Sequence, residues 1–442
     1  MKQMKKILAM VLALTMVFTL CAFGMADGAE PAKEITLWTY PIGNWGNEEV
    51  VNRLVGDFEA ETGIHVTVDY LTYTDGDDRV NSAITGGNTP DLLMEGPDRM
   101  VAGWGAQGHM VNLADMFDET DLEEINPTVM DVVTSDDGSI YLYPLVMTAF
   151  CAGINVDAFK EAGADQYVDL ENHTWTVDGF KAAVQALYDH FGSTAVAVYC
   201  AGQGGDQGTR ALVTNFHGGT YTTPEHDGYT WDDPENIQAI EELAEMQGKG
   251  LEFDASLVGG DEIALFYQGV LKIALCWSIQ QQLDPNLAGT GEGLTMDGDE
   301  IAFMNFPSQE GVDPVLNGGI WGFGIFDNGD DARVAAAKQF IQYMCDSEHT
   351  AEAVREANYF GVRSAAADGT VDLSGIWDDN DTMNEFNATI VPNMGDYYQI
   401  SKGWNQARTA WWTMLQKVGE GEDIPTVVAQ YCAEANEAAA AG

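Results

Sequence analysis

The stretch Asp137-Gly-Ser-Ile-Tyr-Leu-Tyr-Pro144 decides the architecture of the chain, together with Ala152-Gly-Ile-Asn155 and Phe159-Lys-Glu-Ala-Gly163, which follow it. A glycine-containing turn leads into a short strand that we expect to end at Pro144. An apolar segment comes next, and the turn Asn155-Val-Asp157 then opens an amphipathic helix. The stretch therefore predicts a strand, an apolar crossing and a helix in close succession.

Upstream of this crossing, strand and helix patterns alternate regularly. Alternating apolar residues predict strands over 34–39, 64–71 and 90–94, and residues 48–62 and 77–84 have helical periodicity. A βαβαβ order predicts a parallel, doubly wound sheet, whose ligands lie beyond the carboxyl ends of the strands. The loops after Trp38 and Met94 are therefore the first places to look for a site. A length of 442 residues is too great for one ordinary core and suits two α/β lobes.

Several segments carry a resemblance to a known family through their order and spacing. They are Phe58-Glu-Ala-Glu-Thr-Gly-Ile-His-Val-Thr-Val68, Asn88 to Met94 followed by Pro97-Asp98-Arg99, Phe266 to Trp277, Gly318 to Ile325, and Ile400 to Trp404. They resemble extracellular solute-binding protein family 1, the maltodextrin-binding-protein-like receptors of ABC sugar importers. The resemblance runs, with gaps, over almost the whole mature chain. It implies an α/β, periplasmic-binding-protein-like type II fold, with two doubly wound α/β lobes joined by a multi-crossing hinge.

The same resemblance implies how the chain divides between the lobes. Residues 34–147 and 319–366 are expected in lobe 1, and residues 148–318 and 367–442, with the C-terminal helices, in lobe 2. The crossings are then expected near Met147, Gly319 and Ser364.

The first 26 residues have the pattern of an export signal. Lys2, Lys5 and Lys6 precede an apolar run, and small residues follow at Gly24 and Ala26. We expect cleavage after Ala26 and an extracellular or cell-envelope location. A lipid anchor on Cys21 is the alternative, although Leu20 suits it poorly.

The composition excludes several functions. The formal charge is 19 − 70 = −51, which repels nucleic acid and favours an uncharged ligand. The five cysteines after Cys21 are widely spaced and odd in number, so buried free thiols are expected in place of a disulfide framework. We find no nucleophile elbow, P-loop, zincin or complete EF-hand motif, and we expect no cofactor and no metal.

Sugar recognition needs aromatic faces for stacking and charged planar groups for paired hydrogen bonds to hydroxyls. Asp98 and Arg99 follow the third strand, and the family's matching pair binds hydroxyls; an exposed salt bridge is the alternative. Trp404 matches the family's stacking tryptophan, or else packs in a core with Trp411 and Trp412. Trp321 could face the cleft or brace the hinge. The candidate ligand-binding residues are Asp98, Arg99, Trp277, Trp404, Tyr40, Glu95, Thr148, Trp321, Arg408 and Trp45.

Two of these residues depart from the maltodextrin binders. Glu95 stands where they carry an aromatic residue, and Thr148 stands where they carry a carboxylate on the first crossing. These departures predict a rebuilt pocket and a ligand other than maltodextrin.

The predicted function is the substrate-binding component of an ABC carbohydrate importer that captures a mono- or oligosaccharide by hinge closure. Its partners would be a small saccharide and the permease subunits, and we expect a monomer without enzymatic activity. The alternatives are a secreted carbohydrate-active enzyme, for which Glu95 and Asp98 would be the acid pair, and a binder of a polyamine or a metal chelate. The Tyr397-Tyr398 pair raises a ferric-ion site as a further alternative.

Overall fold

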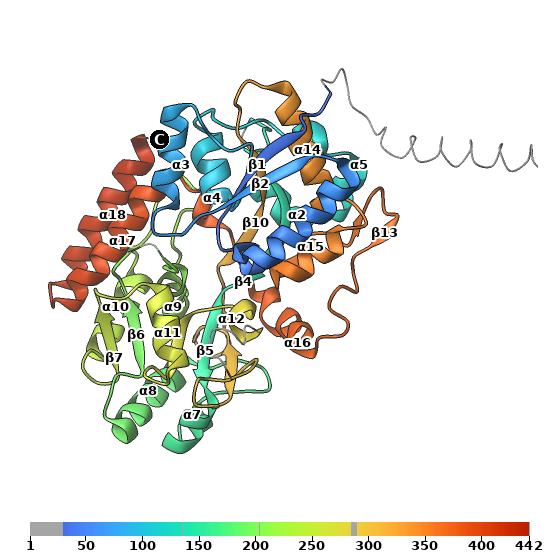
Figure 1. Cartoon of the computed structure of the whole chain (residues 1–442). Coiled ribbons are helices and arrows are strands. Elements are labelled where there is room, and N and C mark those ends of the chain that lie inside the picture. Colours follow the sequence, from blue (N-terminus) through green and yellow to red (C-terminus); the bar gives the residue numbers. More distant parts are fainter. Residues whose placement is uncertain (1–29, 136, 203, 284–289, 442) are drawn as a thin grey trace, which may run out of the picture.

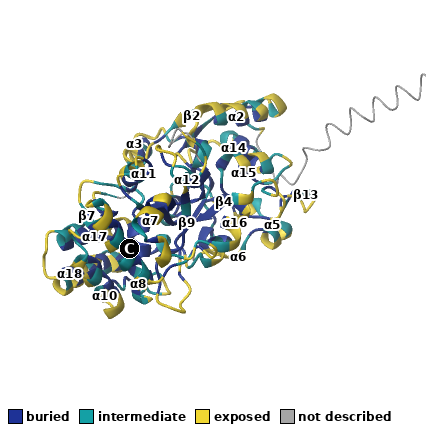
Figure 2. Ribbon diagram, turned by 90° about the horizontal axis from the view of Figure 1, so that it is seen from below, coloured by how far each residue is buried: buried dark blue, intermediate teal, exposed yellow. Residues whose placement is uncertain are grey.

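Two α/β lobes make up the chain, one above the other in the view of Figure 1. The computed structural model describes residues 30–135, 137–202, 204–283 and 290–441. The predicted signal peptide and Cys21 lie outside these residues. Buried residues fill the interior around strand β4 (Tyr143–Ala149), whereas the outer faces of the peripheral helices are exposed (Figure 2).

Lobe 1 is built on a six-stranded sheet with the order β11-β4-β10-β3-β1-β2. Strands β1, β2 and β3 are parallel, while β10 and β4 run antiparallel to their neighbours. The bounds are β1 Glu34–Thr39, β2 His65–Tyr70, β3 Leu92–Glu95, β10 Gly318–Ile325 and β11 Phe360–Gly361. The helices that cover this sheet include α2 Glu48–Thr62, α3 Gly76–Gly86, α14 Asp331–Cys345 and α15 Thr350–Ala357. The predicted βαβαβ order over residues 34–95 is confirmed.

Helix α2 shows how local chemistry sets these boundaries. The Asn47 side chain accepts a hydrogen bond from the Glu49 N–H at the first turn, where Glu48 and Glu49 also complement the helix dipole. Val51, Leu54, Val55 and Phe58 lie on the buried face. Gly63 ends the helix with φ 71°, a left-handed conformation that favours glycine.

Lobe 2 contains a three-stranded sheet of order β8-β5-β9 and a two-stranded parallel sheet of β6 and β7. The bounds are β5 Cys151–Asn155, β6 Val196–Tyr199, β7 Leu251–Asp254, β8 Ile273–Trp277 and β9 Ile301–Met304. Its helices include α7 Val156–Ala162, α8 Val177–Phe191, α9 Gln207–His217, α10 Pro234–Glu245, α11 Gly259–Tyr267 and α12 Ile279–Leu283. The C-terminal pair, α17 Trp404–Gly419 and α18 Ile424–Ala441, packs beside α10 and β7.

The first crossing between the lobes is a single residue long. Strand β4 pairs in the six-stranded sheet up to Ala149, and β5 begins in the other sheet at Cys151, so Phe150 alone separates them. The strand that we expected to end at Pro144 in fact begins at Tyr143. Pro144 has no N–H for the ladder, and the pairing with β10 shifts register between Trp321 and Gly322, beside this proline.

The last crossing lies later than the predicted boundary at residues 366 and 367. The Ala367 N–H donates to Asp346 of α14, and Trp377 Nε1 donates to the Tyr359 carbonyl at 3.0 Å. These bonds hold residues 367–380 against lobe 1. Helix α16, Asp381–Thr389, then places Phe386 between Phe303 and Phe360. His173 of lobe 2 also pairs with Glu385 of α16 at 3.0 Å, so α16 contacts both lobes and the chain passes into lobe 2 there.

Candidate ligand-binding site

The lobe 1 half of the site is a buried arginine surrounded by carboxylates. Arg99 lies in α4, Pro97–Arg99, directly after β3, and its side chain is 10% exposed. Its Nε lies 2.7 Å from Asp77 Oδ1, and its Nη1 lies 3.0 Å from Glu95 Oε1 and 3.2 Å from Asp98 Oδ2. Burial alone would lower the pKa of Arg99, but the three carboxylates keep it well above its usual value. The predicted Asp98–Arg99 pair is therefore one part of a larger ion cluster.

Aromatic rings of lobe 1 cover this cluster on one side. The Arg99 guanidinium lies 5.3 Å from the centroid of Tyr40 and 5.6 Å from that of Tyr73. The Tyr40 hydroxyl donates to Asp77 Oδ1 at 2.5 Å, and burial raises the pKa of Tyr40, so this hydroxyl stays protonated. Burial raises the pKa of Asp77 as well, but Arg99 outweighs that effect and lowers it below its usual value. The arrangement fixes the orientation of both Tyr40 and Arg99.

Glu95 differs from the other two carboxylates. Its side chain is 2% exposed, and burial raises the pKa of Glu95 to about 8 although Arg99 opposes the shift. Asp98 and Asp77 raise it further, while the Gly96 N–H favours the ionised form. Burial thus favours the protonated form of Glu95.

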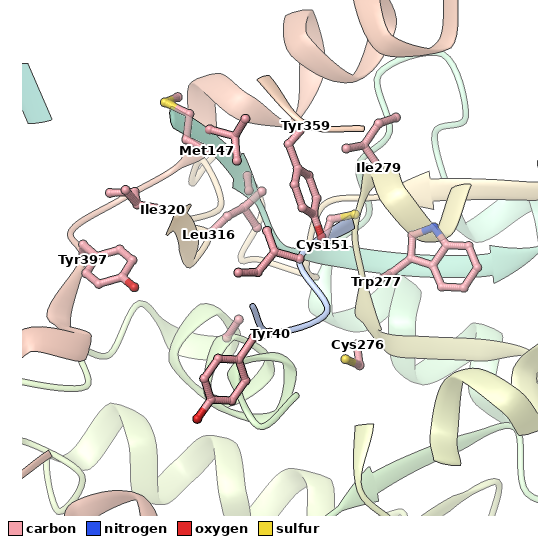
Figure 3. Packing of buried hydrophobic residues seen from close by; sticks show 14 of the residues in the cluster. Tyr40, Met147, Cys151, Cys276, Trp277, Ile279, Leu316, Ile320, Tyr359 and Tyr397 are labelled. Carbon is pink, nitrogen blue, oxygen red and sulfur yellow. The ribbon is translucent and has the colours of Figure 1, made fainter. Parts of the chain in front are cut away.

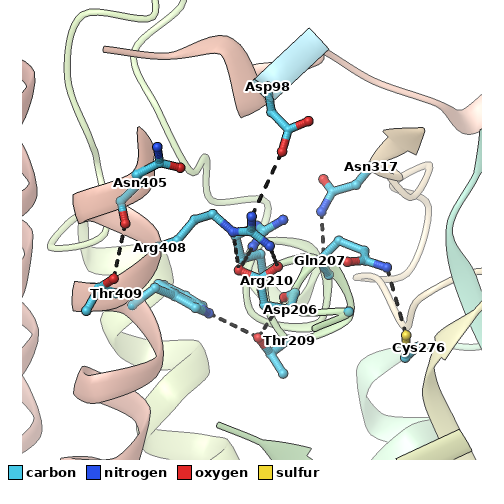
Figure 4. A network of polar contacts seen from close by, with 12 residues as sticks. Asp98, Asp206, Gln207, Thr209, Arg210, Cys276, Asn317, Asn405, Arg408 and Thr409 are labelled. Atoms are coloured by element: carbon cyan, nitrogen blue, oxygen red, sulfur yellow. Dashed lines mark hydrogen bonds and ion pairs between the residues drawn. The ribbon is translucent and has the colours of Figure 1, made fainter. Parts of the chain in front are cut away.

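The lobe 2 half of the site is a second buried ion cluster, drawn in Figure 4. The carboxylate of Asp206, just before α9, accepts two hydrogen bonds from Arg408. They come from Nε at 3.0 Å and from Nη2 at 2.7 Å, which makes the pair bidentate. Arg210 Nη1 lies 2.5 Å from the same carboxylate. Burial would raise the pKa of Asp206, but the two arginines lower it below its usual value. One carboxylate between two guanidiniums leaves this cluster with a net positive charge.

Trp404 begins α17 and lies between these guanidiniums. The centroid of its ring is 5.0 Å from the Arg210 guanidinium and 5.6 Å from that of Arg408. Tyr221 and Tyr398 pack against the same ring. Trp404 is 4% exposed, so it belongs to an aromatic cluster and also borders the charged groups. Both interpretations of Trp404, cleft residue and packed residue, thus describe part of its surroundings.

The two halves meet across the junction of the lobes. Asp98 Oδ2 of lobe 1 lies 3.9 Å from Arg408 Nη1 of lobe 2. The Tyr359 hydroxyl, next to β11, donates to Gln280 Oε1 of α12 at 3.3 Å. Trp321 stacks on Tyr359 with centroids 4.9 Å apart and is partly exposed, so it lies at the hinge and borders the junction.

Three other candidates lie away from these clusters. Trp277 is fully buried between Phe266 and Tyr267, donates from Nε1 to Gln282, and points away from Tyr40 in Figure 3. Trp45 packs on Phe323 and donates to the Ala353 carbonyl inside lobe 1. The Thr148 hydroxyl is buried and bonds to the Ala149 carbonyl. Their surroundings favour packing roles.

Sequence reasoning missed Asp77, Asp206 and Arg210. Asp77 was predicted only as the first residue of a helix over 77–84, and Asp206 follows a glycine-rich segment. Arg210 is four residues after Asp206, a spacing that places two side chains on one helix face. Tyr397 and Tyr398 were singled out for metal binding, but Tyr398 accepts a hydrogen bond from Arg210 Nε at 3.1 Å. The described residues contain no cluster of His, Cys, Asp and Glu suited to a metal ion.

With this geometry in place, comparison with known proteins identifies the family. The sequence model of the bacterial extracellular solute-binding protein family matches residues 53–385. The chain belongs to the bacterial extracellular solute-binding proteins. That range takes in β3, the Asp98–Arg99 pair and the Asp206 cluster up to Arg210.

Curated relatives of this solute-binding protein are partial matches. A maltooligosaccharide ABC transporter solute-binding lipoprotein of Streptococcus pneumoniae is 28% identical over 148 residues, which are 33% of this chain and 32% of that protein. The lipoprotein of the same description from a second strain is 27% identical over 173 residues, 38% of each chain. The chain thus spans about a third of the length of the curated relatives that it matches.

Solved structures share the fold over nearly the whole chain. An ABC transporter solute-binding protein of Thermotoga lettingae, bound to α-D-tagatose, has a TM-score of 0.72 at 17% identity, covering 92% of this chain and 100% of that one. The GacH receptor of Streptomyces glaucescens, described unliganded and with acarbose, has a TM-score of 0.72 at 16% identity, covering 92% and 97%. The periplasmic-binding-protein-like fold expected from the sequence is confirmed.

Two further observations concern the described residues only. Cys151, Cys200, Cys276, Cys345 and Cys432 are all buried free thiols there. Among the described helices, none has both the length and the apolar character that a membrane crossing requires.

Proposed function

We propose that this solute-binding protein is the substrate-binding component of an ABC carbohydrate importer, and that it captures a neutral mono- or oligosaccharide between its lobes. One observation carries the proposal. Lobe 1 supplies Asp98 and Arg99 beside the Tyr40 ring, and lobe 2 supplies Arg408 beside the Trp404 ring. Asp98 and Arg408 lie 3.9 Å apart just beyond the carboxyl end of β3. Such groups bind hydroxyls in pairs and stack on pyranose faces.

The mechanism follows from the separation of the two clusters. Lobe 1 contributes Asp98, Arg99, Tyr40 and Glu95, and lobe 2 contributes Arg408 and Trp404. A ligand that contacts both sets binds the closed arrangement better than the open one and shifts the equilibrium toward closure.

The relatives support the remaining parts of the proposal. The pneumococcal proteins are described as maltooligosaccharide ABC transporter lipoproteins, and the Thermotoga structure contains tagatose. By analogy, the chain acts outside the cytoplasm, as a monomer, and delivers its ligand to permease subunits without chemical change. The exchange at Glu95 sets its saccharide apart from maltodextrin.

A thermal-shift screen tests this function. The panel holds glucose, maltose, maltotriose, xylobiose, ribitol and tagatose, with spermidine as the cationic competitor. A ligand at 100 times its Kd stabilises the native state by about 2.7 kcal/mol, so a binding saccharide raises the melting temperature clearly. A shift with spermidine alone would overturn the saccharide assignment. Release of smaller sugars during overnight incubation would identify an enzyme instead.

A further inference from the structure

Glu95 is the one carboxylate of the lobe 1 cluster with a buried oxygen left over. It is the last residue of β3, opposite Gly322 of β10 in the sheet register. Its Oε1 accepts from Arg99, but Oε2, although buried, makes no hydrogen bond of ordinary geometry with the described residues. A buried polar atom without a partner costs about 1–3 kcal/mol, so such an atom marks a place where a partner is expected.

The charges around Glu95 decide which form of its carboxyl the site holds. Arg99 and Asp98 face it from α4, and Asp77 faces it from α3. Three tyrosine hydroxyls, which burial keeps protonated, lie around the same group: Tyr40, Tyr73 and Tyr397. Arg99 already pairs with Asp77 and Asp98, so an ionised Glu95 would be the third anion paired with Arg99. A second cation, Arg408, lies 3.9 Å from Asp98.

We propose that Glu95 is a specificity-determining residue that binds as a neutral carboxylic acid and donates a hydrogen bond from Oε2 to an uncharged hydroxyl or acetal oxygen of the ligand. This inference rests on the proposed saccharide function and defines its ligand class more closely. Glu95 stands where the maltodextrin binders carry an aromatic residue. We therefore expect this subsite to bind a polar edge of the sugar and not its apolar face. A cationic amine would instead need the ionised form of Glu95.

The proposal predicts a specific pH profile. Since only the protonated acid donates, ligand affinity is constant from pH 5.5 to 7 and falls above about pH 8, the value to which burial raises the pKa of Glu95. One pH unit above that value the protonated fraction is about a tenth, so Kd at pH 9 is roughly tenfold weaker. A glutamine has the same shape, keeps an acceptor for Arg99 and donates at every pH.

The test compares wild type with Glu95→Gln by calorimetric titration at pH 6, 7, 8 and 9, using the panel saccharide with the largest melting shift. Glu95→Gln is expected to stay within threefold of wild type at pH 6 and to lose the tenfold decline at pH 9. Glu300→Gln, an exposed glutamate of lobe 2, is the matched control and should keep the decline. A tenfold loss for Glu95→Gln at pH 6, or an unchanged decline at pH 9, would overturn the proposal.

A second measurement needs no ligand, so it separates this inference from the proposed function. The infrared difference spectrum of wild type minus Glu95→Gln at pH 7 should contain the carbonyl band of a protonated carboxyl. That band should disappear at pH 9.5. A carboxylate signal at pH 7 would contradict the proposal even if a saccharide binds, whereas absence of saccharide binding would refute only the proposed function.

Discussion

Asp98 Oδ2 of lobe 1 lies 3.9 Å from Arg408 Nη1 of lobe 2, and this ion pair joins the two halves of the site. The two partners differ in how they are held. Asp98 also pairs with Arg99, whereas Arg408 is fixed by a bidentate pair with the buried Asp206. Changing Asp98 therefore tests the contact between the lobes with the least damage to either lobe.

Asp98→Asn should weaken closure while preserving the fold. An asparagine keeps the size of the side chain but removes the charge that faces Arg408. A partly screened pair of this kind contributes about 1 kcal/mol, which corresponds to roughly fivefold weaker ligand affinity. Calorimetric titration measures the change, and Asp115→Asn, which breaks the exposed pair with Lys338, is the control. Equal affinities for Asp98→Asn and the control would show that the contact has no role in binding.

Arg408→Ala should lower stability as well as ligand affinity. It removes the bidentate partner of Asp206, which is 2% exposed, and leaves that carboxylate with Arg210. Removing one partner of a buried pair destabilises by about 3–5 kcal/mol. Urea unfolding should show a lower midpoint for Arg408→Ala than for Asp98→Asn. The reverse order would contradict a stabilising pair between Arg408 and the buried Asp206.

Trp277→Phe should lower stability and leave affinity nearly unchanged, whereas Trp404→Phe should weaken ligand binding. Trp277 is fully buried with its Nε1 bonded to Gln282, so Trp277→Phe should lower the free energy of unfolding by about 2 kcal/mol and leave Kd within twofold. Trp404 borders both arginines, so Trp404→Phe should weaken ligand binding about tenfold. Calorimetric titration and urea unfolding of both variants measure the two quantities. An equal loss of affinity in both variants would place Trp277 in the site.

The stability of the protein should fall as the pH rises from about 5 to 9. Burial raises the pKa of both Glu95 and Glu262 to about 8, above the value of an exposed glutamate. The native state therefore binds more protons than the unfolded state between those two values, so the free energy of unfolding decreases as the pH rises through that range. Urea unfolding at pH 5.5, 7 and 9 measures this slope, and Glu95→Gln should reduce it. A slope of opposite sign would contradict the burial of these groups as carboxylic acids.

The sequence was sufficient for the parts of the fold that depend on periodicity. The βαβαβ segment and the Asp98–Arg99 pair could be placed because strand ends in a parallel sheet meet at one edge. It was insufficient for Trp277, whose position at a strand end does not reveal the face that it occupies. A Cβ on Gly153 of β5 would lie 2.8 Å from the Trp277 ring, so the glycine makes room for a buried indole. Nor could periodicity reveal that Asp77 joins Arg99, because they come from different elements.

Small-angle scattering with and without the saccharide that binds best tests the central claim most directly. If the ligand closes the lobes, the ligand-free protein has a larger radius of gyration than the structure described above, and saturation lowers the radius to that of the structure. Asp98→Asn should need more ligand to reach the same radius. An identical radius with and without saturating saccharide would contradict capture by closure between the lobes.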